Sequence, residues 1–380
     1  MILRSKLASE QVTIFTEMSA LANLHGAINL GQGFPNYDPP AKLTSLIDFY
    51  IGQSKHQYAP MAGVIELRKA ISKKNYDSYD IFNSPDDEIT ITAGATQAIF
   101  TAITAFVHTG DEVIIFEPAY DSYRPSILIA GGRPVIYALE GPDFAIDWDL
   151  VSKLVTSKTK MIIINTPHNP TATILKEKDL ESLSAIVKGT EIIVLSDEVY
   201  EHLVFDGKDH QSILKYPELY SQSIAVFSFG KTYHCTGWKI GYCIAPSNIT
   251  KEFRKVHQWN VFSVNSFLQY ALADFISDHS DHKQLPHFYG QKRNLFLHGI
   301  KSSRFTPLHS QGSFFQLCDY SNISDLDDVD FAKELIIKHG VACIPISVFY
   351  SDQRQQNIVR FCFAKTEDTL VQAAKILSKV

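Results

Sequence analysis

The 380-residue chain has few cysteines and no long hydrophobic run. Its five cysteines are scattered without paired spacing and form no zinc-binding signature. We therefore predict no disulfide framework and expect a cytoplasmic protein with reduced thiols. No run approaches the roughly 18 apolar residues of a membrane helix. The longest candidate, residues 98–107, contains Thr101 and Thr104 and is predicted to be a buried helix. The N-terminus, beginning Met1-Ile2-Leu3-Arg4, has no apolar h-region, so no signal peptide is expected.

An excess of basic residues is also lacking. Lys and Arg number 35 against 41 Asp and Glu, which gives a formal net charge of -6. Such a chain offers no positive field for nucleic acid or an anionic membrane, and neither partner is expected. The 14 histidines include no His-Glu-x-x-His motif, and we predict no metal site. With 45% hydrophobic and 20% charged residues the composition is typical of globular proteins, and the length favours two domains.

A dinucleotide-binding loop is the next feature that the sequence lacks. Residues 31–33, Gly31-Gln32-Gly33, open like the glycine fingerprint of such loops. However, Asn36 stands where the third glycine belongs, and Pro35 disrupts the start of the required helix. We therefore predict an irregular loop with exposed backbone over residues 30–40.

Strands and helices alternate through the middle of the chain. The predicted strands are continuous runs rich in Val and Ile, the pattern of a mostly parallel sheet buried on both faces by helices. They cover residues 88–92, 112–116, 134–138, 161–165, 191–196, 223–229 and 242–245. Helices are predicted between them, and a long helix over 250–277 is expected to break near Asn265. Beyond residue 281 helices alternate with short strands at 313–318, 341–344 and 358–363, which predicts a separate α+β unit.

Polar residues follow the ends of these strands. In an open α/β sheet, ligands bind beyond the carboxyl ends of the strands. The residues expected to converge there are Thr96, Tyr120, Asn169, Asp197, Tyr200 and Lys231. We infer one binding crevice at this edge of the sheet.

Each of these residues also has a plain structural explanation. Lys231 could lie in a solvated loop, Asp197 could cap a helix, and Asn169 before a proline could form a turn. A desolvated lysine, however, has a lowered pKa and can act as an amine nucleophile that forms a Schiff base. Arg360 lies inside an apolar run, where a charge is costly unless it is paired.

Taken together, several stretches give the chain a resemblance to the pyridoxal-phosphate (PLP) aminotransferases of the aspartate aminotransferase fold. The resemblance spans nearly the whole chain and is closest to the methionine aminotransferase and kynurenine/glutamine aminotransferase branch. It rests on residues 31–35, 57–58, 94–96, 169–171, 197–200, 228–241 and 360–365. It implies fold type I: an α/β large domain with a mostly parallel seven-stranded sheet, plus a smaller α+β domain.

The resemblance also implies roles for the crevice residues. Lys231 would form the Schiff base with the cofactor aldehyde and then act as general base and acid. Asp197 would keep the pyridine nitrogen protonated. Asn169 and Tyr200 would hydrogen-bond the phenolic oxygen of the ring, and Tyr120 would stack on its face.

For the cofactor phosphate, the resemblance implies a site at a helix N-terminus. The residues that would bind it are Ala95, Thr96, Ser228 and Lys239, with Tyr58 from a second subunit. Arg360 would clamp the substrate α-carboxylate, helped by Gly33 and Asn169. Phe15, Tyr37, Tyr58 and Phe262 would form an aromatic substrate pocket, although each could equally be an ordinary core residue.

Two positions depart from the resemblance. Lys239 stands where many relatives have arginine, so a point charge replaces a two-pronged donor and the phosphate could be held less tightly. Ser263 follows Phe262 where kynurenine-type relatives carry histidine, which weakens the case for kynurenine as the preferred substrate.

We therefore expect an enzyme that transfers an amino group between an L-amino acid, with methionine and large neutral or aromatic side chains favoured, and a 2-oxo acid. Cysteine-S-conjugate β-lyase or kynurenine/glutamine aminotransferase activity is the alternative, and a non-enzymatic PLP-dependent regulator is a third, less favoured hypothesis. We expect a homodimer with shared active sites. The expected ranges are an N-terminal arm with part of the small domain (1–45), a large domain (46–278) and a small domain (279–380).

Overall fold

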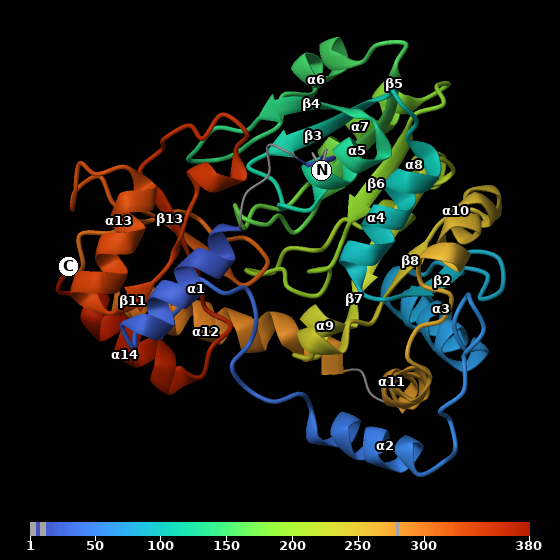
Figure 1. Ribbon diagram of the computed structural model, residues 1–380, viewed down its shortest axis with the longest axis horizontal. Coiled ribbons are helices and arrows are strands. Elements are labelled where there is room, and N and C mark those ends of the chain that lie inside the picture. The colour runs from blue at the N-terminus through green and yellow to red at the C-terminus, as the bar shows by residue number, and fades with distance from the viewer. Residues whose placement is uncertain (1–4, 8–12, 279–280) are drawn as a thin grey trace, which may run out of the picture.

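The computed structural model describes residues 5–7, 13–278 and 281–380 (Figure 1). The predicted N-terminal arm therefore lies partly outside the described residues, at positions 1–4 and 8–12. The first described helix is α1 (Ile14–Leu24), which is followed by the two-residue strand β1 (Ile28–Asn29).

The central sheet has seven strands in the order β2-β8-β7-β6-β5-β3-β4. Their bounds are Ile89–Thr92 (β2), Glu112–Glu117 (β3), Arg133–Ala138 (β4), Thr159–Asn165 (β5), Ile193–Asp197 (β6), Ser223–Ser228 (β7) and Gly241–Ile244 (β8). Strand β8 runs antiparallel to both of its neighbours, and the other neighbouring pairs are parallel. The predicted mostly parallel, seven-stranded sheet is confirmed.

Alternating side chains along the central strands enter two separate hydrophobic clusters, one on each face of the sheet. In β3, Ile114 and Phe116 belong to one cluster, and Val113 and Ile115 belong to the other. Strand side chains alternate between faces, so a continuous apolar run buries both faces of the sheet. Strand β4, at the edge, is only half-buried along most of its length.

Helices cover both faces of this sheet (Figure 1). The helices expected between strands are present as α3 (Ile65–Tyr79), α4 (Ala95–Phe106), α5 (Tyr123–Ala130) and α7 (Glu177–Val187). The helix expected over 250–277 is two helices, α10 (Ser247–Asn260) and α11 (Ser266–Asp278), which are separated around Asn265. Three further helices were not predicted from the sequence: α2 (Ala41–Ile51), α6 (Trp148–Leu154) and α8 (Pro217–Tyr220).

The C-terminal part forms a separate group of strands and helices, at the left of Figure 1. A four-stranded sheet has the order β12-β13-β10-β9. Its strands are β9 (Thr306–Pro307), β10 (Phe315–Asp319), β12 (Ile344–Pro345) and β13 (Ile358–Cys362), and its helices are α12 (Leu285–Gly299), α13 (Asp328–Glu334) and α14 (Glu367–Leu377). Strand β1 pairs in parallel with β11 (Val341–Ala342), so the start of the chain joins this C-terminal part. The domain ranges themselves stay a prediction.

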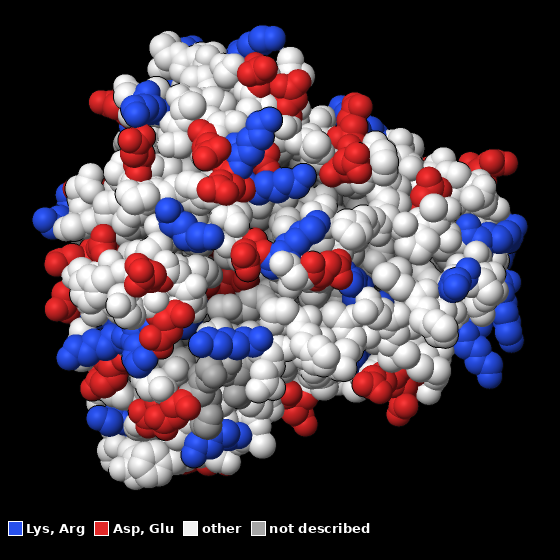
Figure 2. All heavy atoms as spheres, turned by 180° about the vertical axis from the view of Figure 1, so that it is seen from behind, with Lys and Arg blue, Asp and Glu red and all other residues white. Residues whose placement is uncertain are grey.

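On the rear face of the molecule, acidic and basic side chains are interspersed (Figure 2). Surfaces of mixed sign carry no extended field of one charge. Among the described residues, no helix has both the length and the apolar character needed to cross a membrane.

Candidate active site

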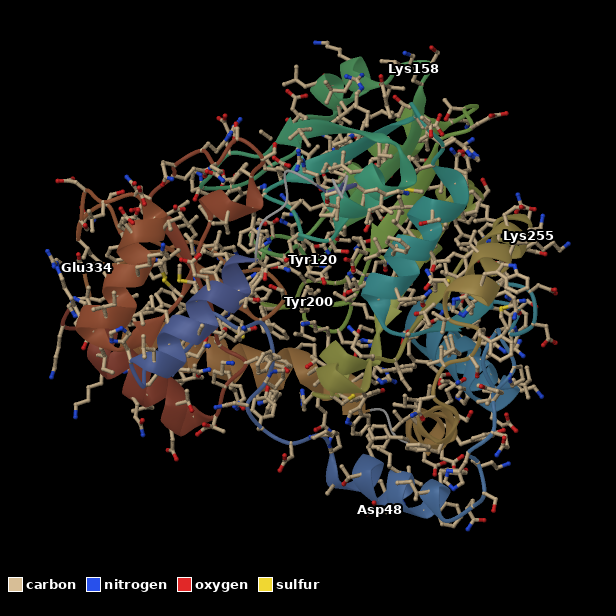
Figure 3. The ribbon with its side chains drawn as sticks, viewed as in Figure 1. Asp48, Tyr120, Lys158, Tyr200, Lys255 and Glu334 are labelled. Atoms are coloured by element: carbon tan, nitrogen blue, oxygen red, sulfur yellow. The ribbon has the colours of Figure 1, made fainter. Side chains whose placement is uncertain are left out.

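The ends of five strands of the large sheet surround one cavity of about 150 Å³. It lies where the sheet meets the C-terminal part, and Tyr120 and Tyr200 mark this central position in Figure 3. Nine of the sequence-predicted residues line it: Ala95, Thr96, Tyr120, Asn169, Asp197, Tyr200, Ser228, Lys231 and Lys239. Parallel strands deliver their carboxyl ends to the same edge, and this explains why residues more than 100 positions apart meet here.

Lys231 lies on the short helix α9 (Phe229–Thr232), directly after β7. Its Nζ donates a hydrogen bond to the Gly33 carbonyl at 2.7 Å and lies over the rings of Tyr200 and Phe314. Burial lowers the pKa of Lys231 to about 8, and the charge of Arg360 acts in the same direction. A substantial fraction of this amine is therefore neutral, and nucleophilic, near pH 8.

Asp197, the last residue of β6, is also buried. It accepts a hydrogen bond from the Tyr123 hydroxyl at 2.6 Å and a weaker one from the Val199 backbone at 3.3 Å. Burial raises the pKa of Asp197 to about 6, although both hydrogen bonds lower it. The carboxyl group is thus mainly ionised at neutral pH and can hold a proton on a basic nitrogen.

Two residues that support this site, Tyr123 and Asn165, were not among the predicted site residues. Tyr123 orients Asp197, and its only sequence signal was its position three residues after Tyr120, in the segment that follows β3. Asn165 was interpreted only as a strand end, but its side chain donates to the Asp197 carbonyl at 2.8 Å and accepts from the Asn169 backbone at 2.8 Å. Asn165 also lines the cavity, so it ties two predicted residues together.

Another part of the cavity lining is suited to an anion. Helix α4 begins there after Gly94, and no side chain caps its N-terminus. The Lys239 Nζ lies 3.5 Å from the position that a Cβ of Gly94 would occupy. The Thr96 and Tyr120 hydroxyls are hydrogen-bonded at 3.0 Å. Free backbone N–H groups, a helix dipole and an ammonium group together favour a phosphate.

Arg360, in β13, is held beside the cavity by Asn169. Its side chain donates to the Asn169 Oδ1 at 2.5 Å and to the Gly31 carbonyl at 3.2 Å, while its buried Nε has no partner among the described residues. The guanidinium lies over Phe315 at 3.9 Å, and Phe15 of α1 lies 5.4 Å away. Burial lowers the pKa of Arg360 to about 10, so it stays charged at neutral pH.

The remaining predicted aromatics lie outside the cavity. Tyr37 is packed against His234 and Phe288, with ring centroids at 4.9 and 5.7 Å. Tyr58 and Phe262 form an edge-to-face pair at 5.0 Å, and they are 81% and 51% exposed. Within one chain, therefore, neither Tyr58 nor Phe262 contacts the site.

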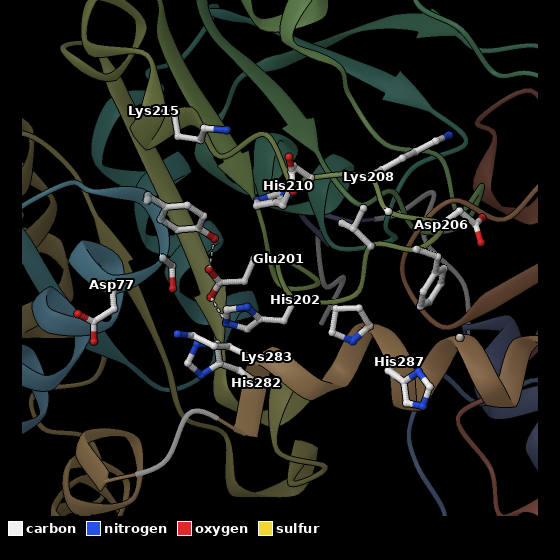
Figure 4. Close-up of a pocket in the computed structure, with 18 of the residues that line it drawn as sticks. Asp77, Glu201, His202, Asp206, Lys208, His210, Lys215, His282, Lys283 and His287 are labelled. Atoms are coloured by element: carbon white, nitrogen blue, oxygen red, sulfur yellow. Dashed lines mark hydrogen bonds and ion pairs between the residues drawn. The ribbon is translucent and has the colours of Figure 1, made fainter.

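A larger cleft, of about 980 Å³, lies elsewhere and contains none of the predicted residues. It gathers Glu201, His202, His210 and His282 (Figure 4). Glu201 accepts hydrogen bonds from the buried Lys74 at 2.6 Å and Tyr79 at 2.7 Å. Among the described residues no group of three or more His, Cys, Asp or Glu is arranged to hold a metal ion. We therefore place the candidate active site in the smaller cavity.

The chain matches the family model described as aminotransferase class I and II over residues 25–377. It is 48% identical over 381 residues to the methionine aminotransferase of Escherichia coli, covering 100% of this chain and 99% of that protein. A crystal structure reported for an E. coli methionine aminotransferase superposes with a TM-score of 0.98 at 48% identity, covering 100% of both chains.

More distant relatives carry other substrate names. A probable N-succinyldiaminopimelate aminotransferase of Mycobacterium tuberculosis is 35% identical, covering 98% of this chain and 97% of that protein. A kynurenine–oxoglutarate transaminase of Dictyostelium discoideum is 34% identical, covering 97% of this chain and 94% of that protein.

These matches run the full length of the fold and include the strands that carry the cavity residues. The architecture is that of the fold type I PLP-dependent transferases, as the sequence predicted. The chain belongs to the class I and II aminotransferases and is an enzyme of that family.

Proposed function

We propose that this enzyme uses PLP to transfer an amino group between an L-amino acid, preferably methionine or another large neutral or aromatic one, and a 2-oxo acid. The observation that carries the proposal is the buried Lys231 amine, whose pKa is lowered to about 8 and which lies in one cavity with Asp197. A neutral amine beside an ionised carboxylate is the pair that Schiff-base chemistry on a pyridine aldehyde requires.

The residues of the cavity fit PLP. The cavity lining includes the acid Asp197, the amine of Lys231, and an anion site built by the α4 N-terminus and Lys239. Ser228 also lines the cavity, and Tyr120 offers an aromatic face. When bound, PLP would supply an electron sink for the substrate Cα.

The protein residues would then act as follows. The Lys231 Nζ would remove the proton from the substrate Cα and deliver a proton to the cofactor carbon C4′. Asp197, held by Tyr123, would keep the ring nitrogen protonated. Asn169 and Tyr200 would hydrogen-bond the phenolic oxygen of the ring. Lys239 would offer the phosphate a positive charge but, unlike arginine, no planar pair of donors. We therefore expect phosphate binding to depend on the α4 backbone as well.

Arg360 is our candidate for binding the substrate α-carboxylate. It is oriented by Asn169 and Gly31, is enclosed by aromatic rings, and retains a donor at Nε without a partner among the described residues. We propose Gly33 as a second contact of the carboxylate. A charged donor in an apolar enclosure binds a carboxylate strongly.

The preference for methionine rests on the E. coli relative and on the aromatic surroundings of Arg360. Kynurenine or glutamine as the amino donor is the alternative, supported by the kynurenine transaminase relative. The Ser263 hydroxyl donates to the Ala59 carbonyl at 3.0 Å, so it fixes the loop that carries Phe262. Tyr37 stays a proposed pocket residue, although it does not itself line the cavity.

We also propose a homodimer in which Tyr58 and Phe262 of one subunit complete the site of the other. Both rings are exposed although they pack on each other, and an exposed aromatic pair is typical of a surface that a partner covers. We place the enzyme in the cytoplasm, and its five cysteines are free and buried.

A spectroscopic titration tests the proposed reaction. The purified protein with added PLP should absorb in the visible range, methionine should bleach this band, and a 2-oxo acid should restore it. The Lys231→Ala variant should bind PLP but lose activity by roughly 10³-fold or more, because its general base is gone. A protein that remains colourless with PLP, or a Lys231→Ala variant of normal activity, would refute the proposal.

Cysteine-S-conjugate β-lyase activity is a second candidate because it begins with the same removal of the Cα proton. A panel of amino donors, including methionine, kynurenine and an S-conjugate of cysteine, separates the two reactions by their products. A new amino acid formed from the 2-oxo acid indicates transamination, whereas pyruvate and ammonia indicate the lyase.

A further inference from the structure

The loop of residues 31–34 presents four successive backbone carbonyls to three different cations. The Gly31 carbonyl accepts from Arg360 at 3.2 Å, and the Gly33 carbonyl accepts from Lys231 at 2.7 Å. The carbonyls of Gln32 and Phe34 alternate with these two along the chain. Both accept hydrogen bonds from the Lys365 Nζ, at 3.3 and 2.8 Å. Alternate carbonyls therefore point to the active-site cations and to Lys365.

Lys365 is buried, at 3% exposure. It lies three residues after the end of β13, the strand that contains Arg360. The ion pairs found among the described residues do not include it. Its Nζ also lies 5.0 Å from the centre of the Phe34 ring. A buried ammonium group is costly unless hydrogen bonds compensate it, so the loop carbonyls are the main polar partners that this charge has.

A second buried lysine fixes the backbone of this segment. The Lys292 Nζ, from α12, donates to the Lys365 carbonyl at 2.8 Å. Lys292 thus holds the main chain of Lys365, while Lys365 holds the loop. Lys365 belongs to residues 360–365, one of the stretches on which the family resemblance rests, but no role was predicted for it.

We propose that Lys365 is a positioning residue that sets where the Gly31 and Gly33 carbonyls meet Arg360 and Lys231. The inference rests on the proposed function of those two residues. By binding the carbonyls on the far side of the loop, Lys365 keeps the near-side carbonyls turned toward the site.

The loop has little freedom to move closer to the core. A Cβ on Gly31 would lie 3.1 Å from Ile344, and a Cβ on Gly33 would lie 3.0 Å from Phe315. Removal of the Lys365 donors therefore lets the loop move outward, away from Arg360 and Lys231. We expect the orientation of Arg360, and with it the binding of the substrate carboxylate, to suffer first.

The test compares Lys365→Met, which keeps the bulk of the side chain, with Lys365→Arg, which keeps the charge and the donors. In the PLP-loaded enzyme, hydrogen exchange of a peptide covering residues 31–36 should become about tenfold faster in Lys365→Met, as for the loss of one hydrogen bond to a charged group. KM for methionine should rise about tenfold with kcat within about threefold, and Lys365→Arg should recover most of both losses.

Lys292→Met is the comparison variant, because it removes a buried lysine of α12 that donates to the Lys365 carbonyl but not to the loop carbonyls. It should lower the melting temperature but accelerate exchange of residues 31–36 much less than Lys365→Met does, because the Lys365 donors to the loop remain. If Lys365→Met melts early but keeps wild-type loop exchange and wild-type KM, Lys365 is only structural and the proposal is wrong. If Lys365→Met does not fold, Lys365→Gln, which retains a neutral donor, takes its place with the same expected results.

The exchange measurement does not depend on turnover. If wild-type protein exchanged slowly in the loop but did not transaminate, the proposed function would fail while the role of Lys365 in holding the loop would stand. If turnover were normal but the loop exchange were insensitive to Lys365, only the positioning role would fail.

Discussion

Lys231 and Arg360 are both cations enclosed by aromatic side chains, but burial has different consequences for them. The pKa of Lys231 falls to about 8, which makes a neutral amine available close to physiological pH. The pKa of Arg360 falls to about 10, which leaves its charge intact. The same desolvation thus leaves Lys231 available as a neutral amine and Arg360 as a charged donor.

A first prediction concerns the pH dependence of PLP capture by the cofactor-free chain. Lys231 must be neutral to attack an aldehyde, and its pKa is about 8. Below pH 8 the capture rate, followed by visible absorbance, should rise about tenfold for each pH unit, because the neutral fraction does so, and it should level off above pH 8. A midpoint near that of an ordinary lysine would contradict the burial argument.

A second prediction concerns Arg360→Lys. Lysine keeps the charge but cannot donate from a planar fork to Asn169 and Gly31 at once. KM for the amino donor should rise by roughly 10- to 100-fold, because two geometrically fixed contacts are lost. The affinity for PLP, measured by absorbance titration, serves as the control and should change little. An unaltered KM would exclude Arg360 as the carboxylate-binding residue.

Among the elements, β8 and α4 set the shape of the anion end of the cavity. Strand β8 runs against the direction of its neighbours, so its first residue, Gly241, lies beside the carboxyl end of β7. A Cβ there would lie 2.5 Å from the Phe227 carbonyl and 3.1 Å from the Ala95 backbone nitrogen. Gly241 is therefore what allows the start of α4 to pack against the sheet edge.

A third prediction follows for Gly241→Ala. The methyl group would push main chain against main chain, so the free energy of unfolding should fall by about 1–3 kcal/mol, as measured by urea denaturation. PLP should also bind about tenfold more weakly, since the α4 N-terminus shifts. Gly237→Ala is the control because a Cβ at Gly237 meets nothing within 4 Å. Equal effects of the two substitutions would disprove the packing explanation.

At the scale of the whole molecule, the start of the chain returns to the C-terminal part. Pairing of β1 with β11 brings the loop at Gly31 beside β13, and Phe15 of α1 lies over Arg360. Residues some 330 positions apart thereby share one site. The pair Tyr58 and Phe262 does not line the cavity and is exposed to solvent in the isolated chain.

A fourth prediction uses mixed dimers of Lys231→Ala and Tyr58→Ala subunits. If each site takes Lys231 from one subunit and Tyr58 from the other, one site of the mixed dimer is wild type and the other carries both defects. Activity should then reach about half of the wild-type value, above that of either variant alone. Activity no higher than the mean of the two variants would show that the sites are not shared.

Much of the site could be predicted from the sequence because its residues follow strand ends. Continuous apolar strands predict a buried parallel sheet, and such a sheet brings Thr96, Asn169, Asp197 and Lys231 to one edge. The break near Asn265 was also visible. The helices α2, α6 and α8 were not, since short amphipathic stretches give weak periodic signals.

Only the tertiary structure decided how these residues support one another. The sequence by itself determined the sheet, the edge at which the candidate site residues meet and, through its resemblance, the family. It could not place Tyr123 on Asp197 or Lys365 behind the loop of Gly33, because side-chain contacts between distant segments leave no periodic pattern. The lowered pKa of Lys231 is likewise a tertiary property, because burial by packed neighbours, and not the lysine itself, removes the water that stabilises its charge.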